Sequence, residues 1–154
     1  MMMETRPSVS VCAMKILVVE DEPVVQAYAV AVLSRAGFEV EVESNGDEAF
    51  RRYRVSGPYS LVLTDICHPG MDGFDLVKAI RRENRTQAIV IVTGNVDAVY
   101  VFPESADFRR MFKDIAVLEK PFRVQQLLKM VEAAMETRQE TVLPSDAPNT
   151  PANG

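Results

Sequence analysis

The sequence predicts an α/β fold, in which helices cover both faces of a parallel sheet. Three observations predict it. Short apolar runs alternate along the chain with segments of helical periodicity. The connections between them are short, as is typical of right-handed parallel crossovers. Residues 59–64 and 88–92 are almost continuously apolar, which indicates strands that are covered on both faces.

The first predicted strand is the apolar run at residues 15–19. A helix is predicted over 24–36, because Pro23 suits a first helical turn and Gly37 suits a C-terminal cap. Its apolar residues recur at a spacing that places them on one face: Val25, Ala29, Val32 and Leu33. Residues 38–43 alternate strictly between apolar and acidic side chains, which predicts a strand with one exposed face at the edge of the sheet.

The alternation of helix and strand continues to residue 138. The later predicted elements are helices at 47–56, 72–84, about 103–113 and 124–138, and strands at 59–64, 88–92 and 115–118. Two of these helices carry an inward-facing apolar stripe, formed by Phe74, Val77 and Ile80 in one and by Leu127, Leu128, Val131 and Ala134 in the other. Five strands and five helices result, which predicts a doubly wound (βα)5 domain. We expect the flavodoxin-like arrangement, whose strand order is 2-1-3-4-5.

One domain is predicted, over residues 14–138. Residues 1–13 lack periodicity and are expected to be a disordered N-terminal extension. Pro, Asn, Thr, Ser and Gly dominate from 139 onward, so residues 139–154 are expected to form a disordered tail.

The composition narrows the functional class. Apolar residues make up 47% and charged residues 25%, as in ordinary soluble proteins, and no stretch is long and apolar enough for a membrane helix or a signal peptide. Two cysteines do not make a disulfide framework, so a cytoplasmic protein without membrane contact is expected. The net charge of −5 argues against nucleic-acid binding.

Polar groups that suit phosphoryl transfer follow four of the predicted strands. Glu20 and Asp21, then Asp65, Thr93 and Lys120, come directly after or at the end of apolar runs. Because the carboxyl ends of parallel strands lie along one edge, these groups are expected to converge there, with the acidic pair beside Asp65. Two unit charges about 4 Å apart repel by about 4 kcal/mol at an effective dielectric near 20, so the crowding favours a divalent cation. An all-oxygen ligand set favours Mg²⁺.

Each of these groups has a role in phosphoryl transfer. Asp65 would be the nucleophile, while Mg²⁺ and Lys120 would share the charge of the transferred group. The Thr93 hydroxyl could donate a hydrogen bond to a remaining phosphoryl oxygen. Gly94, which has no side chain, would leave the approach to Asp65 open.

Four motifs resemble the receiver domain of response regulators in two-component signalling, over about residues 14–136: Val19-Glu20-Asp21-Glu22, Thr64-Asp65-Ile66-Cys67-His68-Pro69-Gly70-Met71-Asp72-Gly73, Val92-Thr93-Gly94 and Glu119-Lys120-Pro121-Phe122. The resemblance implies that Asp65 is the phosphoacceptor and that Glu20, Asp21 and the Cys67 backbone carbonyl help to hold Mg²⁺. It also implies that Thr93 is the switch hydroxyl and Lys120 the phosphate-pairing lysine.

The sequence departs from the family pattern at several positions. Val117 stands where the family usually has an aromatic residue that moves with the switch hydroxyl, so that coupling is not predicted here. Thr93 and Lys120 are farther apart than expected, with Pro103 between them. His68 stands where Met or another apolar residue is frequent, although a lone histidine in a loop is most often exposed.

Each motif also has a simpler interpretation. Glu20, Asp21 and Glu22 could merely cap the next helix, and Lys120 could be a solvated strand end. Cys67 and His68 are too few soft ligands for a zinc site. A haloacid-dehalogenase-like phosphatase would need a second Asp two residues after the nucleophile, where this chain has Cys67. A pseudo-receiver would lack an acidic or lysine position, and none is missing.

The sequence thus predicts a stand-alone receiver that is not a turnover enzyme but catalyses its own phosphorylation and dephosphorylation. Its expected partners are a sensor histidine kinase or a phosphotransfer protein and an unknown downstream protein, with the chain itself a monomer or weak dimer. A role as a phosphate relay or sink stays open, because it uses the same chemistry.

Overall fold

A computed structural model describes residues 14–95, 112 and 114–149 of the chain. The predicted extension at 1–13, almost all of the predicted helix at 103–113 and the last five residues lie outside the described part. No helix in the described ranges has the length and apolar content needed to cross a membrane.

Five parallel strands form one sheet in the order β2-β1-β3-β4-β5, which confirms the predicted topology. The strands are β1 (Lys15–Val19), β2 (Glu39–Glu43), β3 (Leu61–Asp65), β4 (Ile89–Thr93) and β5 (Ala116–Glu119). The helices in the described residues are α2 (Pro23–Arg35), α3 (Gly46–Ser56), α4 (Gly73–Glu83) and α7 (Val124–Asn149).

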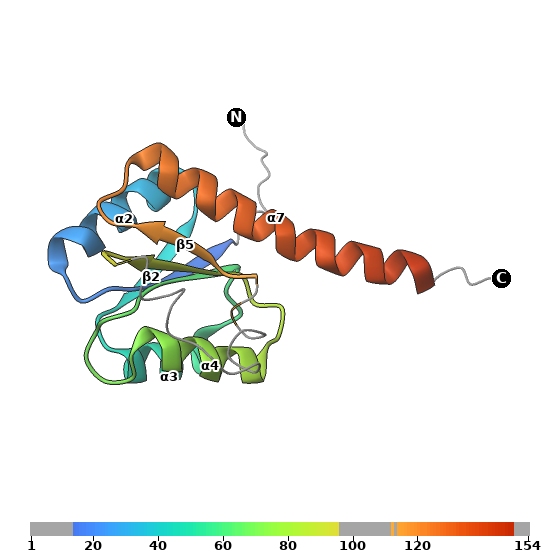
Figure 1. Cartoon of the computed structure of the whole chain (residues 1–154), viewed down its shortest axis with the longest axis horizontal. Coiled ribbons are helices and arrows are strands. Elements are labelled where there is room, and N and C mark those ends of the chain that lie inside the picture. The colour runs from blue at the N-terminus through green and yellow to red at the C-terminus, as the bar shows by residue number, and fades with distance from the viewer. Residues whose placement is uncertain (1–13, 96–111, 113, 150–154) are drawn as a thin grey trace, which may run out of the picture.

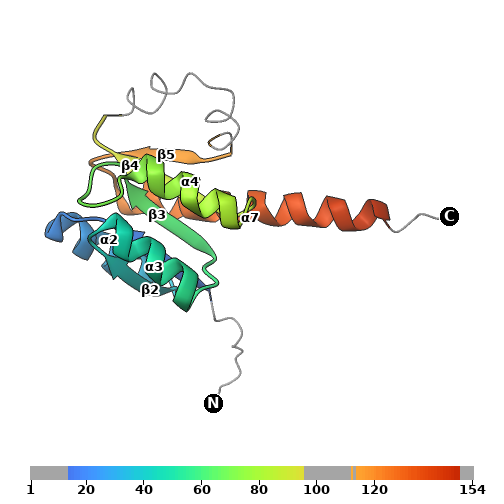
Figure 2. The same ribbon diagram turned by 90° about the horizontal axis from the view of Figure 1, so that it is seen from below.

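Helices cover both faces of the sheet, as Figures 1 and 2 show, with α2 and α7 on one side and α3 and α4 on the other. Alternate residues of β1 serve the two faces. Ile16 and Val18 pack with Leu33 and Leu127 on the side of α2 and α7, whereas Leu17 packs with the cluster on the side of α3 and α4. Two apolar cores therefore hold the sheet between them, and both bury most of their side chains completely.

Local signals explain where α2 begins and ends. Pro23 occupies its first turn, where a missing N–H leaves no bond unmade. The chain leaves the helix through Gly37, whose φ of 101° is the left-handed conformation that glycine adopts without strain. The inward face is the predicted one, since Ala29, Val32 and Leu33 are buried.

β2 is an edge strand, as its alternation predicts, but its acidic side chains are not simply solvated. The Arg52 side chain on α3 binds Glu43 with Nε at 2.6 Å and reaches Glu41 with Nη1 at 3.4 Å. The buried Tyr59 hydroxyl donates to Glu41 at 2.5 Å, and Lys15 Nζ lies 3.7 Å from the same carboxylate. These partners form the β2 cluster, Lys15, Glu41, Glu43, Arg52 and Tyr59, which ties the edge strand to β1, to α3 and to the segment just before β3.

The last helix is longer than the sequence predicts. Its inward face is the expected one, because Leu127 and Val131 are fully buried. The predicted end at Arg138 is wrong, since α7 continues to Asn149 and projects well beyond the sheet (Figures 1 and 2). Glu136, Arg138 and Gln139 are favourable helix residues, so the helix can propagate past the predicted end.

Candidate functional site

The polar residues that follow the strands meet at one edge of the sheet. β1 lies beside β3, with Val19 paired to Thr64, so Glu20 and Asp65 leave neighbouring strands at the same level. β4 and β5 are the next strands along, and Lys120 N donates to Thr93 O at 2.9 Å. The predicted convergence of Glu20, Asp65, Thr93 and Lys120 at this edge is therefore present in the fold.

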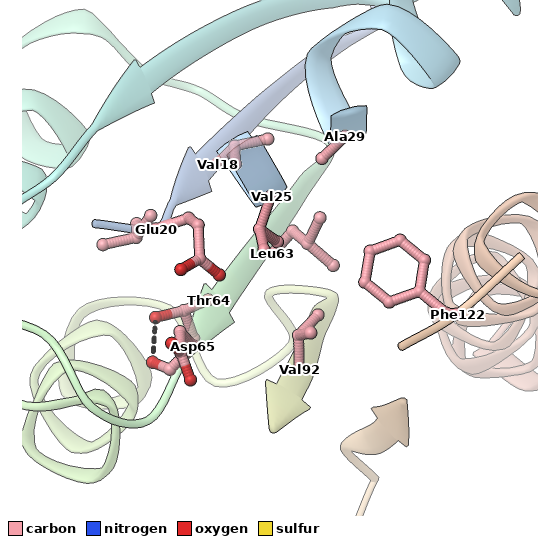
Figure 3. A pocket seen from close by; sticks show the side chains of 10 residues that line it. Val18, Glu20, Val25, Ala29, Leu63, Thr64, Asp65, Val92 and Phe122 are labelled. Atoms are coloured by element: carbon pink, nitrogen blue, oxygen red, sulfur yellow. Dashed lines mark hydrogen bonds between the residues drawn. The ribbon is translucent and has the colours of Figure 1, made fainter. Parts of the chain in front are cut away.

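Three carboxylates form an acidic cluster there. Glu20, Asp21 and Asp65 each present an oxygen, and these atoms all lie within 4.8 Å of one another. Glu20 and Asp65 are buried, whereas Asp21 is exposed. Figure 3 shows the carboxylates of Glu20 and Asp65 beside the apolar side chains that line the rest of a pocket, Val18, Leu63, Val92 and Phe122 among them.

Lys120 reaches this cluster from the end of β5. Its Nζ lies 3.1 Å from Asp65 Oδ2, 3.1 Å from Glu20 Oε1 and 3.1 Å from Glu22 Oε1. Only 17% of the Lys120 side chain is exposed, so these are short ion pairs in a partly desolvated place. One positive charge therefore serves three carboxylates, and the site stays negative overall.

The surroundings shift two pKa values. Burial raises the pKa of Glu20 above its ordinary value, and the Asp65 charge adds to this, although hydrogen bonds from the Glu22 amide and Lys120 act in the opposite direction. For Lys120, burial alone would lower the pKa. Hydrogen bonds to Asp65, Glu22 and Glu20 outweigh it and raise the pKa, so the amine stays protonated.

The two oxygens of Asp65 have different partners. Oδ1 accepts from the Ile66 amide at 2.7 Å and from the Cys67 amide at 3.4 Å. Oδ2 is bound by Lys120. The carboxylate is thus fixed from two sides, by the loop that follows β3 and by the end of β5, before any ligand arrives.

The acidic cluster fits a divalent cation. Its donors are hard carboxylate oxygens from two strand ends, and two of them are buried next to each other, which costs energy unless positive charge is near. Oxygen donors of this kind suit Mg²⁺ rather than a softer metal.

Two predicted site residues, Thr93 and Cys67, make no side-chain hydrogen bond to the acidic cluster among the described residues. Thr93 is buried, and its hydroxyl oxygen accepts from Asn95 N at 3.0 Å and lies 3.4 Å from Asn95 O. No hydrogen bond joins Thr93 to Asp65 in the part of the chain that the structure describes. The Cys67 side chain is a free, exposed thiol beside the site.

Sequence reasoning gave two residues the wrong role. Glu22 belongs to the first motif, and the only role that the sequence suggests for it is a possible helix cap; as the N-cap of α2 it makes no side-chain cap bond and binds Lys120 instead. His68 was expected to be exposed and is buried, with Nε2 at 3.2 Å from Thr64 Oγ1. The place of Glu22 two residues after Glu20 could have suggested its role, whereas nothing in the sequence indicates that of His68.

Comparisons with known proteins agree with this geometry. The family model described as Response regulator receiver domain matches residues 16–132. The response regulator receiver protein CpdR of Brucella abortus is 35% identical over 118 residues, which cover 77% of this chain and 93% of CpdR. The regulatory protein VanRB of Enterococcus faecalis is 30% identical over 80% of this chain, and the chain spans only 53% of that relative.

Solved structures show the same fold. A response regulator receiver domain protein from Clostridium thermocellum superposes with a TM-score of 0.70 at 25% identity, over 83% of this chain and 98% of that one. The response regulator TrrA from Thermotoga maritima, in complex with Mg(2+)-BeF, gives a TM-score of 0.67 at 27% identity, over 79% of this chain and 98% of that one. The chain therefore belongs to the response regulator receiver domain family.

Proposed function

We propose that this receiver domain accepts a phosphoryl group on Asp65 and signals through the protein contacts that the phosphorylated form makes. The observation that carries the proposal is the placement of Asp65, whose Oδ2 lies 3.1 Å from Lys120 Nζ while the carboxylates of Glu20 and Asp21 crowd the same edge. A nucleophile, a cation to pair with phosphoryl oxygens and a ligand set for a metal ion are the parts that phosphoryl transfer needs.

In the proposed reaction, an Asp65 carboxylate oxygen attacks the phosphorus of the donor. A new O–P bond forms, the bond from phosphorus to the donor atom breaks, and its electron pair leaves with the donor. Lys120, held protonated by its three acidic neighbours, moves from these carboxylates toward the phosphoryl oxygens as their charge arrives. The Thr93 hydroxyl, which bonds the Asn95 backbone in the unphosphorylated protein, is proposed to exchange that partner for a phosphoryl oxygen.

Glu20, Asp21 and Asp65, with the Cys67 backbone carbonyl, are the proposed ligands of Mg²⁺. When bound, the cation would supply charge that offsets the repulsion between the carboxylates and an incoming phosphoryl group. The donor chemistry supports this assignment, as does the Mg(2+)-BeF complex of the similar TrrA.

The proposed phosphodonor is a phosphohistidine on a sensor kinase or a phosphotransfer protein, because the family model assigns a receiver. The acyl phosphate adds about two negative charges at a site that is already acidic. Its repulsion with Glu20 and Glu22 is the proposed driving force for the change in surface contacts, and its hydrolysis would end the signal.

A small phosphodonor such as acetyl phosphate tests the proposal. The protein is incubated with it, with and without Mg²⁺, and intact mass is measured. One added phosphoryl group is expected only with Mg²⁺, and it should be absent from Asp65→Asn and present in Asp75→Asn, a matched change at an exposed aspartate of α4. A wild-type protein that stays unmodified with Mg²⁺ would indicate a pseudo-receiver, and continuous turnover of phosphomonoesters would indicate a phosphatase.

A further inference from the structure

His68 belongs to the loop that joins β3 to α4, its side chain is buried, and the proposed reaction gives it no role. Only 8% of the residue is exposed. Its Nε2 is 3.2 Å from the hydroxyl oxygen of Thr64, which is itself 1% exposed. Nδ1 is buried and has no hydrogen-bond partner among the described residues. A buried imidazole that uses only one of its two nitrogens needs an explanation beyond packing.

A count of hydrogens assigns the direction of this contact. The Thr64 hydroxyl has one hydrogen, and its oxygen lies 2.8 Å from the Asp65 carbonyl oxygen, a bond drawn as the dashed line in Figure 3. If that hydrogen goes to the carbonyl, His68 must donate Nε2–H to Thr64 Oγ1. The other tautomer would ask one hydrogen to serve two acceptors and would leave a buried N–H at Nδ1 without an acceptor.

The peptide between Asp65 and Ile66 extends this chain of bonds to the proposed acceptor. Its C=O accepts from Thr64 at 2.8 Å, and its N–H donates to Asp65 Oδ1 at 2.7 Å. Gly73 also lies close to this carbonyl, because a Cβ on Gly73 would be 2.4 Å from its oxygen. The tilt of this peptide therefore decides where the donor to Oδ1 lies, and Thr64 fixes the tilt.

We propose that His68 is a positioning residue for the phosphoacceptor, acting through Thr64 and the Asp65–Ile66 peptide on the orientation of the Asp65 carboxylate. The inference rests on the proposed function of Asp65. His68 donates to Thr64, Thr64 donates to the carbonyl, and the same peptide donates to Oδ1, which leaves Oδ2 on the side of Lys120. The remainder of the loop has its own ties, Gly73 N to Ile66 O at 2.8 Å and Gly46 N to Pro69 O at 3.0 Å, so losing the imidazole bond should not release the loop.

Two substitutions at position 68 separate a hydrogen bond from packing. His68→Gln keeps a donor, because its amide nitrogen can occupy the place of Nε2, whereas His68→Met fills the space without one. Loss of one neutral hydrogen bond is expected to lower the rate of Mg²⁺-dependent phosphorylation by about fivefold in His68→Met. His68→Gln should recover most of that rate. Urea unfolding of both variants would show that they are folded.

Thr64→Val tests the same chain of hydrogen bonds at its middle residue. It removes the hydroxyl at nearly constant volume, so it should slow phosphorylation at least as much as His68→Met. The double variant should be no slower than Thr64→Val alone, because the two residues act in one chain. Independent, multiplying effects would overturn the proposal.

An NMR measurement on the unphosphorylated protein separates this inference from the proposed function. The short Ile66 N–H bond to Asp65 should place that amide proton far downfield, and the shift should be lost in His68→Met and kept in His68→Gln. An unchanged Ile66 shift in His68→Met, or equal phosphorylation rates in wild type and His68→Met, would overturn the role of His68. A wild-type protein that takes up no phosphate would instead contradict the function of Asp65, whatever the NMR result.

Discussion

Charge balance at single residues decides how this site behaves without a ligand. Glu20 has only 4% of its side chain exposed and lies beside Asp65, yet both share the amine of Lys120. Water cannot screen these charges well, so removal of the Lys120 amine should cost more than loss of an ordinary surface ion pair. Glu22 is different, because 61% of its side chain is exposed and solvent screens its bond to Lys120.

Lys120→Met should therefore destabilise the protein in the absence of Mg²⁺. The expected loss in the free energy of unfolding is about 2 kcal/mol, below the range for a fully buried pair, because Lys120 is partly exposed and Glu20 can take up a proton. Urea unfolding followed by circular dichroism measures it. Lys129→Met, at an exposed position of α7, is the matched control and should change little. Equal stability of both variants would show that the acidic cluster does not depend on Lys120.

Sequence reasoning predicted the residues of the site whose position follows from the ends of strands. Asp65 and Lys120 were predicted to meet because parallel strands end at one edge, and they are 3.1 Å apart. His68 and Glu22 were misjudged because their partners depend on how loops fold over the sheet. No periodicity in the sequence reports that Thr64 lies under His68 or that Lys120 reaches past Glu20 to Glu22.

At the scale of elements, β2 shows how an edge strand is held. Its alternation predicted the edge position, but not that the β2 cluster would pair the acidic side chains. Tyr59 donates to Glu41 from a nearly fully buried position, and Arg52 reaches the same carboxylate from α3. The hydrogen bond from Tyr59 lowers the pKa of Glu41 most, and Lys15 and Arg52 lower it further against the opposing effect of burial.

Tyr59→Phe should weaken this attachment in a pH-dependent way. Loss of a hydrogen bond to a charged group should cost about 1.5–3 kcal/mol at neutral pH. Because the folded pKa of Glu41 is depressed, its contribution is fully present above its ordinary value of 4.5 and is lost as the pH falls through the lower folded value. The deficit of the variant should therefore shrink in acid.

Urea unfolding at neutral pH and below pH 4.5 measures both parts of this prediction. Tyr28→Phe is the control, since the Tyr28 hydroxyl has no hydrogen bond among the described residues and its ring keeps its contact with Phe122. A Tyr59→Phe deficit of the same size in acid would contradict the assigned role of Glu41.

The start of α4 sets the room available to the loop after β3. A Cβ on Gly73 would lie 2.4 Å from Asp65 O and 2.6 Å from Ile66 Cα, both backbone atoms. Gly73→Ala should therefore cost about 1–3 kcal/mol and slow phosphorylation, because the displaced peptide carries the donor to Asp65. At Gly94 a Cβ would meet no atom of the described residues within 4 Å, so Gly94→Ala should leave the unfolding free energy unchanged. Thermal melts and acetyl phosphate labelling test the pair, and equal stabilities would refute the crowding argument.

Element boundaries were harder to predict than element order. The order follows from alternating periodicity, and each of the five predicted strands is present. The end of α7 was misplaced because Pro144 and Pro148 marked the tail more strongly than the preceding helix-favouring residues marked the helix. Helix propensity near a terminus is a weak signal. The presence or absence of a few tertiary contacts can decide where such a helix ends.

For the whole molecule, the acidic cluster joins segments that are far apart in the chain. Glu20 and Asp21 follow β1, and Asp65 ends β3, so a cation held between them would bridge two central strands of the sheet. Any ligand that binds the folded state alone raises the free energy of unfolding by mass action. The cation would also reduce the repulsion between the carboxylates of Glu20, Asp21 and Asp65.

MgCl₂ should therefore stabilise the protein more than NaCl of equal ionic strength, by about 2.7 kcal/mol at a concentration of about 100 times the dissociation constant. Glu20→Gln should remove most of this gain, since it deletes a buried ligand, and should itself be near neutral or stabilising without Mg²⁺ because it relieves the repulsion with Asp65. Glu48→Gln, a half-exposed position paired with Arg51 away from the cluster, should keep the full gain.

Urea midpoints of the wild type and the two variants, each in the two salts, test this prediction. A gain that is the same in both salts, or that survives in Glu20→Gln, would mean that Mg²⁺ acts by general screening and does not bridge β1 to β3.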